Sequence, residues 1–195
     1  MIIKNYLTNI SKNEGKILLE HLITSKTRIK LLLKFFANPG NKGYLRELAK
    51  EFAESTNAVR VELNRLAQAD LLKCEDEGRT KVYSANERHT LFPEISSMVH
   101  KFLGIDILAE LIESKVRALG QVQLVAIIGD YAQGIDSGLI QVMIFGECLD
   151  KELLVRLQEK AQELLGKNIS VQILPRSEIK NWQANEMLVV WGDKL

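Results

Sequence analysis

The sequence has few of the residues and segments that mark metal-binding, secreted or membrane proteins. Its two cysteines, Cys74 and Cys148, lie far apart in strand-like surroundings, so we expect reduced core thiols and neither a disulfide nor a metal site. The three histidines show no metal-ligand spacing with them, and we predict no metal and no cofactor. No apolar run approaches the length needed to cross a bilayer, and the polar N-terminus does not resemble a secretory signal. We therefore expect a cytoplasmic protein.

A strong net charge is also lacking, because the whole chain carries only +1 at pH 7. The charge is nevertheless divided unevenly. Residues 1–104 hold 17 lysines and arginines against 12 acidic residues, a net of +5, whereas residues 105–195 hold 9 against 13, a net of −4. This division favours a polyanion such as DNA as the partner of the N-terminal part. A length of 195 residues allows two small domains, each with its own core.

Two short amphipathic helices joined by a tight turn are predicted between Tyr44 and Leu72. In the first helix, apolar residues recur at the spacing of one helical face, which predicts that this face is buried. These residues are Leu45, Leu48, Ala49 and Phe52. The turn falls on Ala53 and Glu54. Ser55 is suited to cap the second helix, because its hydroxyl can accept a hydrogen bond from a free amide at the helix start.

The second helix, from about Thr56, has an apolar side and a polar side. The inward stripe consists of Val59, Leu63, Leu66 and Ala67. The opposite side carries Asn57, Arg60, Val61, Asn64 and Gln68. Amide side chains can pair with adenine, a guanidinium with guanine, and a small apolar side chain can contact the methyl group of thymine. This side is therefore a candidate reader of base sequence, although any one of these residues would also suit a solvated face.

A β-hairpin is predicted after the helix pair, with strands over residues 71–75 and 80–84 and a turn that contains Gly78. Helix, turn, helix and hairpin in this order indicate a winged helix. The hairpin places two basic residues beside the second helix, where they can neutralise phosphates that flank the groove. Three acidic residues at positions 75–77 oppose such a contact, so we interpret the hairpin as a support and not as a reader of sequence. The predicted DNA-binding residues are Ser55, Thr56, Asn57, Arg60, Val61, Asn64, Arg79 and Lys81.

Further helices are predicted on both sides of this unit. A short helix over residues 16–23 and a longer one over 25–37 precede it, and a loop over 38–43 follows them. After the hairpin, helices are predicted over 93–103 and 106–119. These last two either pair with a second subunit, giving a homodimer whose recognition helices reach two half-sites, or pack on the C-terminal part of the chain. The sequence leaves both alternatives open.

From Gly120 onward the pattern changes to strands interleaved with a helix. Apolar segments predict strands at 122–128, 138–145, 169–174 and 187–191. A helix over 150–165, closed by Gly166, lies between the second and third strands. We therefore predict an α+β chain. A winged helix-turn-helix DNA-binding domain, with N-terminal and connector helices, spans residues 1–104, and an α/β domain with a small mixed sheet, covered largely on one side, spans residues 105–195.

The N-terminal features resemble the DNA-binding domain of bacterial winged-helix repressors of the arsenical-resistance (ArsR-like) type. The resemblance covers about residues 25–104 and includes a lysine-rich first helix, the helix pair, an A-D-L-L exit at residues 69–72 and the wing. It implies a transcriptional regulator whose partner is double-stranded DNA.

Two features of the C-terminal part resemble the small bacterial nucleotidyltransferases. IIGDYAQG, at residues 127–134, is similar to the glycine-serine loop of that family, F-G-S-x-A-R-G, and residues 92–111 are similar to the connector in regulators that fuse a winged helix to such a domain. In an active member the loop binds the nucleotide phosphates. Two carboxylates of a following S-D-x-D strand hold the magnesium that offsets the developing charge in phosphoryl transfer.

The residues that this resemblance assigns to catalysis are missing from the chain. The acidic positions of the strand fall on Leu139 and Gln141, and a third acidic position falls on Gln172. The serine and arginine positions of the loop are an acid and a neutral amide, which should repel a triphosphate. We expect no catalytic residue and a domain that keeps the fold without the reaction. The degenerate nucleotide loop comprises Gly129, Asp130, Gln133 and Gly134.

Three functions are compatible with the sequence. The leading hypothesis is a sequence-specific DNA-binding transcriptional regulator that is not an enzyme, in which the C-terminal domain serves dimerisation or senses an unknown small-molecule effector. An active nucleotidyltransferase is the second, and it would need metal ligands at other positions, for example Asp130 with Asp136. A winged helix that binds protein instead of DNA is the third, because a fold alone does not decide function.

Overall fold

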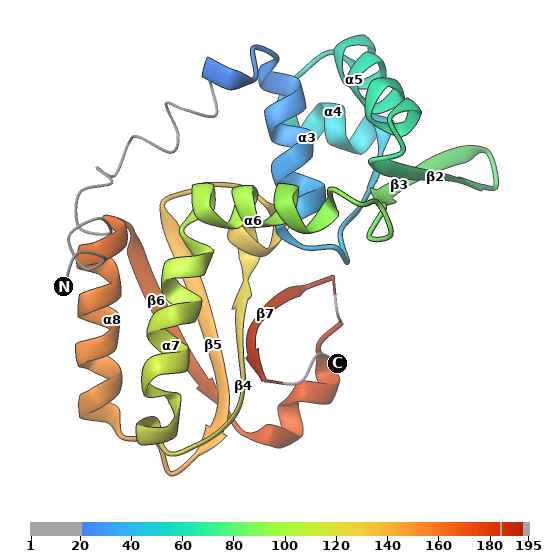
Figure 1. The fold of residues 1–195 in the computed structure, drawn as a ribbon. Helices are drawn as coiled ribbons and strands as arrows, with labels where there is room; N and C mark the ends of the chain where they lie inside the picture. The colour runs from blue at the N-terminus through green and yellow to red at the C-terminus, as the bar shows by residue number, and fades with distance from the viewer. Residues whose placement is uncertain (1–20, 184, 193–195) are drawn as a thin grey trace.

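A computed structural model describes residues 21–183 and 185–192 of the chain, and Figure 1 shows their arrangement in two adjoining halves. The described part is the predicted mixture of helices with two small sheets, one in each half. The short helix predicted over residues 16–23 lies mostly outside the described residues. None of the helices in the described part is both long enough and apolar enough to cross a membrane.

The N-terminal half is a winged helix-turn-helix, as the sequence predicts. Its elements are α3 Lys26–Ala37, β1 Lys42–Tyr44, α4 Leu45–Phe52, α5 Thr56–Gln68, β2 Leu72–Glu77 and β3 Thr80–Ala85. Strands β2 and β3 form the wing hairpin, and β1 pairs antiparallel with β3, so the sheet order is β1-β3-β2. The loop predicted over residues 38–43 is partly wrong, because Lys42 and Gly43 belong to β1.

Two connector helices, α6 Phe92–Leu103 and α7 Ile105–Leu119, join the halves. Helix α6 packs on α3, with the rings of Phe36 and Phe92 5.6 Å apart. Helix α7 lies beside α8, Lys151–Leu165, across one face of the C-terminal sheet (Figure 1). Helix α7 thus packs on the C-terminal part, as one of the two alternatives has it, whereas α6 packs on α3 of the N-terminal half, which neither alternative named. The homodimer stays a prediction.

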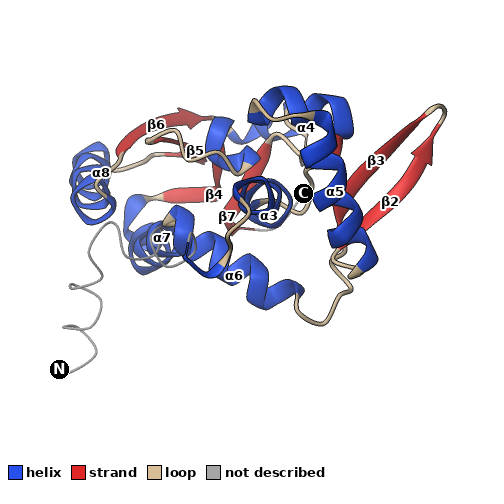
Figure 2. Ribbon diagram, turned by 90° about the horizontal axis from the view of Figure 1, so that it is seen from above, coloured by secondary structure: helices blue, strands red, loops and turns tan. Residues whose placement is uncertain are grey.

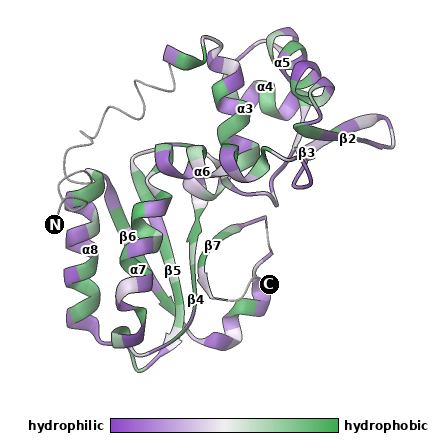
Figure 3. Cartoon of the chain, in the orientation of Figure 1, coloured by the Kyte–Doolittle hydropathy of each residue, from purple (hydrophilic) through white to green (hydrophobic). Residues whose placement is uncertain are grey.

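The C-terminal half contains a mixed sheet with strand order β6-β5-β4-β7. Its strands are β4 Gln121–Ile128, β5 Leu139–Glu147, β6 Asn168–Leu174 and β7 Met187–Gly192. Strands β5 and β6 are parallel and joined by α8, and the other pairs are antiparallel. Most of the length of β4, β5 and β6 is coloured as hydrophobic in Figure 3. These strands and helix α8 confirm the predicted α/β arrangement.

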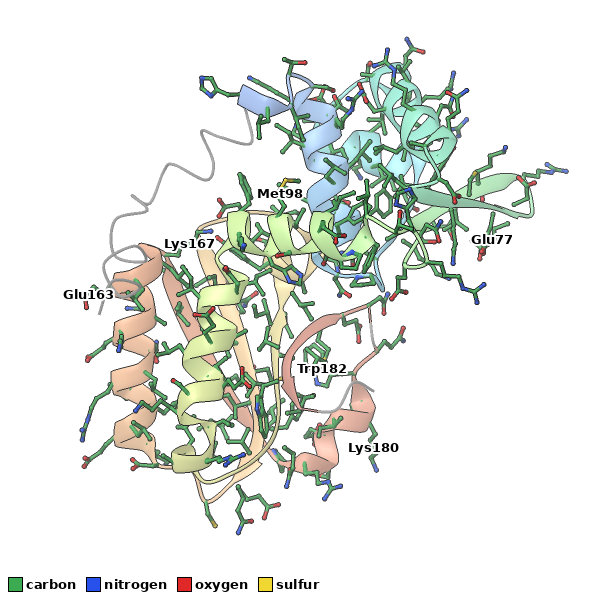
Figure 4. All side chains as sticks on the ribbon, in the orientation of Figure 1. Glu77, Met98, Glu163, Lys167, Lys180 and Trp182 are labelled. Carbon is green, nitrogen blue, oxygen red and sulfur yellow. The ribbon has the colours of Figure 1, made fainter. Side chains whose placement is uncertain are left out.

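The two faces of this sheet are covered differently. Helices α7 and α8 cover one face. On the other face lies a short 3-10 helix, η2 Arg176–Asn181, after which Trp182 packs against a small apolar cluster that includes Met143 and Phe145 (Figure 4). Both α-helices therefore lie on one face, and the sheet is covered largely on one side, as predicted.

One apolar core runs through both halves of the molecule. Phe35 and Phe36 of α3, both fully buried, belong to the same cluster as Val125 of β4 and Ile140 of β5. A second 3-10 helix, η1 Gly129–Gln133, follows β4 and packs directly on α3. The division into two domains at residue 104 stays a prediction, and the buried interior is continuous across it.

The prediction that both cysteines are core thiols is wrong, because Cys74 and Cys148 are exposed. Cys74 lies on β2, which is exposed from its second residue to its last because the wing projects from the molecule (Figure 2). Cys148 follows β5 with a left-handed backbone, at φ 53°, where the chain turns toward α8. Strand-like surroundings in the sequence did not indicate burial at either position.

Candidate nucleic-acid interface

Helix α5 presents its polar side to solvent because its apolar side is fixed in the core. Val59 and Leu63 are 0% exposed. At the helix start, the Oγ atom of Ser55 accepts a hydrogen bond from the amide of Ala58 at 3.1 Å, which is the predicted cap. With its start and its buried side both fixed, the helical spacing of 100° per residue sets the direction of each outward side chain.

The predicted DNA-binding residues lie on exposed surface of two neighbouring elements. Four of them, Asn57, Arg60, Val61 and Asn64, are on the outward side of α5, Ser55 and Thr56 are at its N-terminal end, and Arg79 and Lys81 are on the wing. Figure 2 shows α5 and the wing next to each other at one end of the molecule. All eight residues are exposed, and their role in DNA binding stays a prediction.

The base of the wing adjoins α5 near Arg60. Tyr83 of β3 is buried, and this burial, together with a hydrogen bond to Cys74 across the hairpin, raises the pKa of its hydroxyl. The positive charge of Arg60 lowers the same pKa. Helix α5, which carries Arg60, packs against β2 of the hairpin.

The wing itself has no strongly positive surface. Positions 75–77 are acidic and exposed, and Figure 4 shows Glu77 projecting from the hairpin. The carboxylate of Glu77 accepts a hydrogen bond from the hydroxyl of Tyr44 on β1, and this bond raises the pKa of that hydroxyl. Three basic residues, Lys73, Arg79 and Lys81, share the hairpin with these three acids, so its charges balance. This charge distribution supports the interpretation of the wing as a support for α5.

A buried carboxylate ties α5 to α3, and the sequence analysis missed it. Glu62 is 6% exposed. Its Oε2 atom accepts a hydrogen bond from Nε of Arg28 at 2.8 Å, and its Oε1 atom accepts hydrogen bonds from Arg65 and Ser25, each at 3.1 Å. Burial raises the pKa of Glu62, but the hydrogen bonds from Arg28 and Ser25 and the nearby positive charges outweigh it, so the pKa lies below its ordinary value of 4.5. The available signal was its position three residues after Val59, on the inward side of the helix.

Replacing Glu62 by glutamine should destabilise the chain at neutral pH and have much less effect in acid. The amide keeps the shape of the side chain but loses the charge-assisted hydrogen bonds with the two arginines, a loss of about 2 kcal/mol in the free energy of unfolding. Because the pKa is lower in the folded state, this stabilisation is fully present above the unfolded-state pKa, near 4.5. It is lost as the pH falls through the folded-state pKa. Urea unfolding of the wild-type chain and of the Glu62→Gln variant, at pH values from neutral to acidic, measures the difference in their free energies of unfolding. A difference that does not change with pH would contradict the assignment.

The degenerate nucleotide loop forms η1 and its flanks, and the side chain of Tyr131 occupies the buried side of this loop. Tyr131 is fully buried, and its hydroxyl donates a hydrogen bond to Asp136. Lys167 (Figure 4) lies with Nζ 3.1 Å from Oδ1 of Asp136 and 4.7 Å from the centroid of the Tyr131 ring. Burial and the bond to Asp136 raise the pKa of Tyr131 well above its ordinary range. Asp136, one of the two alternative metal ligands, is therefore engaged by a lysine and a tyrosine.

The positions where the family resemblance expects carboxylates lie on one face of the sheet. Leu139 and Gln141 alternate along β5 with buried residues that face α7 and α8, and Gln172 lies on the neighbouring β6 with the same orientation. Gln141 packs over Gly129, since a Cβ atom added to Gly129 would lie 2.1 Å from Oε1 of Gln141. Among the described residues, no group of three or more His, Cys, Asp or Glu side chains is arranged to hold a metal ion. Two amides and one aliphatic side chain offer no ionised oxygen at these positions.

Comparisons with known proteins assign no family to the chain. No family model and no curated protein matches it. The solved structure of reduced HlyU from Vibrio cholerae is similar over 45% of this chain and 86% of that chain, with 18% sequence identity and a TM-score of 0.34. A similarity of this size identifies neither a family nor a function, so the proposals below are argued from the residues of this chain.

Proposed function

We propose that this chain is a cytoplasmic transcriptional regulator that binds double-stranded DNA sequence-specifically. The observation that supports this proposal most strongly is the set of polar side chains on the outward side of α5. Asn57, Arg60 and Asn64 are exposed there, at spacings of three and four residues, on a helix whose opposite side is buried in the core. Amides and a guanidinium spaced by about one helical turn are the groups that pair with base edges in the major groove.

The charge distribution supports the same partner. The net charge of +5 in residues 1–104 favours a polyanion, and the wing supplies Arg79 and Lys81 for the phosphates that flank the groove. Binding through such contacts releases counterions, so the affinity falls as the salt concentration rises. Two recognition helices in a homodimer would reach half-sites about one turn of DNA apart, and we include this dimer in the proposal.

We also propose that the C-terminal half is an inactive nucleotidyltransferase-like domain and that the chain is not an enzyme. The supporting observation is that Leu139, Gln141 and Gln172 stand at the positions of the three acids, so magnesium would find no carboxylates there. Asp130 adds a negative charge where a phosphate would bind. The domain would then act in dimerisation or in sensing a small-molecule effector.

A footprinting experiment tests the proposed function. The full chain is incubated at low salt with genomic fragments of its source organism, and protection from a nuclease is mapped. We expect protection of defined sites at submicromolar protein and its loss as salt is added. Absence of protection at every site below micromolar protein would refute the proposal, and transfer of label from a nucleoside triphosphate in the presence of magnesium would refute its second part.

A further inference from the structure

The degenerate nucleotide loop is docked on the winged helix through a buried lysine. Lys34 of α3 is 7% exposed. Its Nζ atom donates a hydrogen bond to Oε1 of Gln133 in the loop at 3.0 Å, and it contacts both carboxylate oxygens of Glu51 on α4 at 3.0 and 3.1 Å. One ammonium group therefore joins the loop, α3 and α4.

The amide side chains of Gln133 and Asn41 make further hydrogen bonds around this contact between the loop and α3. The Nε2 atom of Gln133 donates a hydrogen bond to the carbonyl oxygen of Asn185 at 2.9 Å, so the orientation of this side chain is fixed at both ends. Asn41 is 1% exposed, and its Nδ2 atom donates to the carbonyl oxygens of Lys34 at 2.8 Å and Ala132 at 3.0 Å. The loop and α3 are thus held together by buried hydrogen bonds of the Asn41 side chain.

The residue type at position 133 is matched to Lys34. An arginine, which the loop resemblance places at this position, would bring a second positive charge to the Lys34 ammonium. The amide of Gln133 instead offers an oxygen acceptor to the ammonium and a donor to the backbone. Hydrogen bonds from a charged group in a buried setting are stronger than neutral ones at the surface, so this contact resists displacement.

We propose that Gln133 and Lys34 are positioning residues for DNA binding. Through the Lys34 ammonium, the loop of the C-terminal half holds Glu51 and with it α4. Helix α5 follows α4 after a turn of three residues, 53–55, so a movement of α4 is transmitted through this turn to the N-terminal end of α5, where Ser55, Thr56 and Asn57 lie. This inference rests on the proposed function, and it makes the loop the point at which an event in the C-terminal half changes DNA affinity.

The substitution Gln133→Arg tests the inference in the full chain. The added charge opposes the Lys34 ammonium and is expected to release α4. We expect affinity for a duplex selected by binding to the wild-type chain to fall roughly tenfold, the factor that corresponds to the loss of one hydrogen bond of this type. The dependence of affinity on salt should stay unchanged, because no phosphate contact is lost. Backbone amides of α4 should exchange with solvent deuterium roughly tenfold faster, since exchange follows the free energy of local opening.

A matched control and a rescue separate positioning from a general loss of structure. Gln172→Arg adds the same charge at an exposed position of the same half, and both affinity and exchange should stay at wild-type values. Combining Gln133→Arg with Lys34→Met leaves a single cation opposite Glu51, and affinity should return to within about threefold of wild type, since the like-charge repulsion is gone. If Gln133→Arg does not fold, Gln133→Leu removes the same hydrogen bonds without adding charge and is judged by the same measurements.

The outcomes distinguish this inference from the proposed function. If the wild-type chain binds the duplex, and Gln133→Arg binds it more weakly and exchanges its α4 amides faster, both the proposed function and the inference are supported. Wild-type binding with unchanged affinity and exchange in that variant overturns the inference and leaves the proposed function intact. A wild-type chain that binds no duplex refutes the proposed function and with it the role of Gln133 and Lys34 in DNA binding. If the amides of α4 then also exchange at the same rate in Gln133→Arg and Gln172→Arg, the coupling between the loop and α4 is overturned as well.

Discussion

Replacing Arg60 by alanine is expected to lower the preference for the cognate sequence over other duplexes by roughly tenfold to a hundredfold, because one bidentate contact to a base is worth about 1–3 kcal/mol of discrimination. Arg60 is exposed and is separated from Asn64 by one turn of α5. Asn64→Ala is expected to have a similar effect at a different base pair. Competition between the cognate duplex and single-base variants, followed by fluorescence anisotropy, measures this preference.

The wing provides the comparison for this prediction. Lys81→Ala removes a charge from the hairpin and should weaken binding to all sequences alike, with the slope of log affinity against log salt reduced by about 1. Gln172→Ala changes an exposed amide of β6 and should change neither quantity. If Arg60→Ala weakened every duplex equally, α5 would not be reading bases and the assignment of its outward side would be wrong.

Replacing Gly134 by alanine is expected to give a large loss of stability, about 4 kcal/mol in the free energy of unfolding, from a left-handed backbone and a steric clash together. Gly134 has φ +77°, and an added Cβ atom would lie 2.2 Å from the carbonyl oxygen of Leu33 on α3. The neighbouring atoms are backbone, so no side chain can rotate away. The loop and α3 would have to separate, although the contact between them lies within the core that is continuous through both halves. Urea unfolding followed by far-ultraviolet circular dichroism measures the change.

Gly138 is the matched control for this substitution. It has φ +82°, but an added Cβ atom would meet no atom within 4 Å. Gly138→Ala should therefore cost only the backbone conformation, about 1 kcal/mol. Equal losses for the two variants would show that the contact between the loop and α3 contributes little to stability.

The local signals in the sequence predicted most of the fold. In α5, the apolar spacing identified the buried side, and the hydroxyl of Ser55 identified the start, because both depend on residues within a few positions of each other. The strands of the C-terminal half were found in the same way, from short apolar segments separated by turns and a capped helix. Strand β1 was missed because its three residues show no alternation and their pairing partner, β3, is about 40 residues away along the chain.

The contacts that organise the candidate site are mostly long-range, and the sequence does not contain a local signal for them. Lys34 and Gln133 are 99 positions apart, and nothing near either residue indicates that they meet. Gln133 and Gly134 were singled out as parts of a degenerate nucleotide loop, whereas the structure gives each a packing role against α3. Glu62 had a local signal, but its charge concealed that its spacing puts it on the buried side of α5.

The most direct test of the central claim is to locate α5 on DNA. A cleavage reagent is attached to a cysteine introduced at Gln68, an exposed residue on the outward side of α5 that is not among the predicted DNA-binding residues. The exposed native thiols, Cys74 and Cys148, are replaced by serine, and the complex with the cognate duplex is allowed to react. The account predicts cuts confined to a few adjacent base pairs in the major groove, and no such cuts when the reagent is attached at Gln172. Cleavage that is absent, or spread evenly along the duplex, would contradict it.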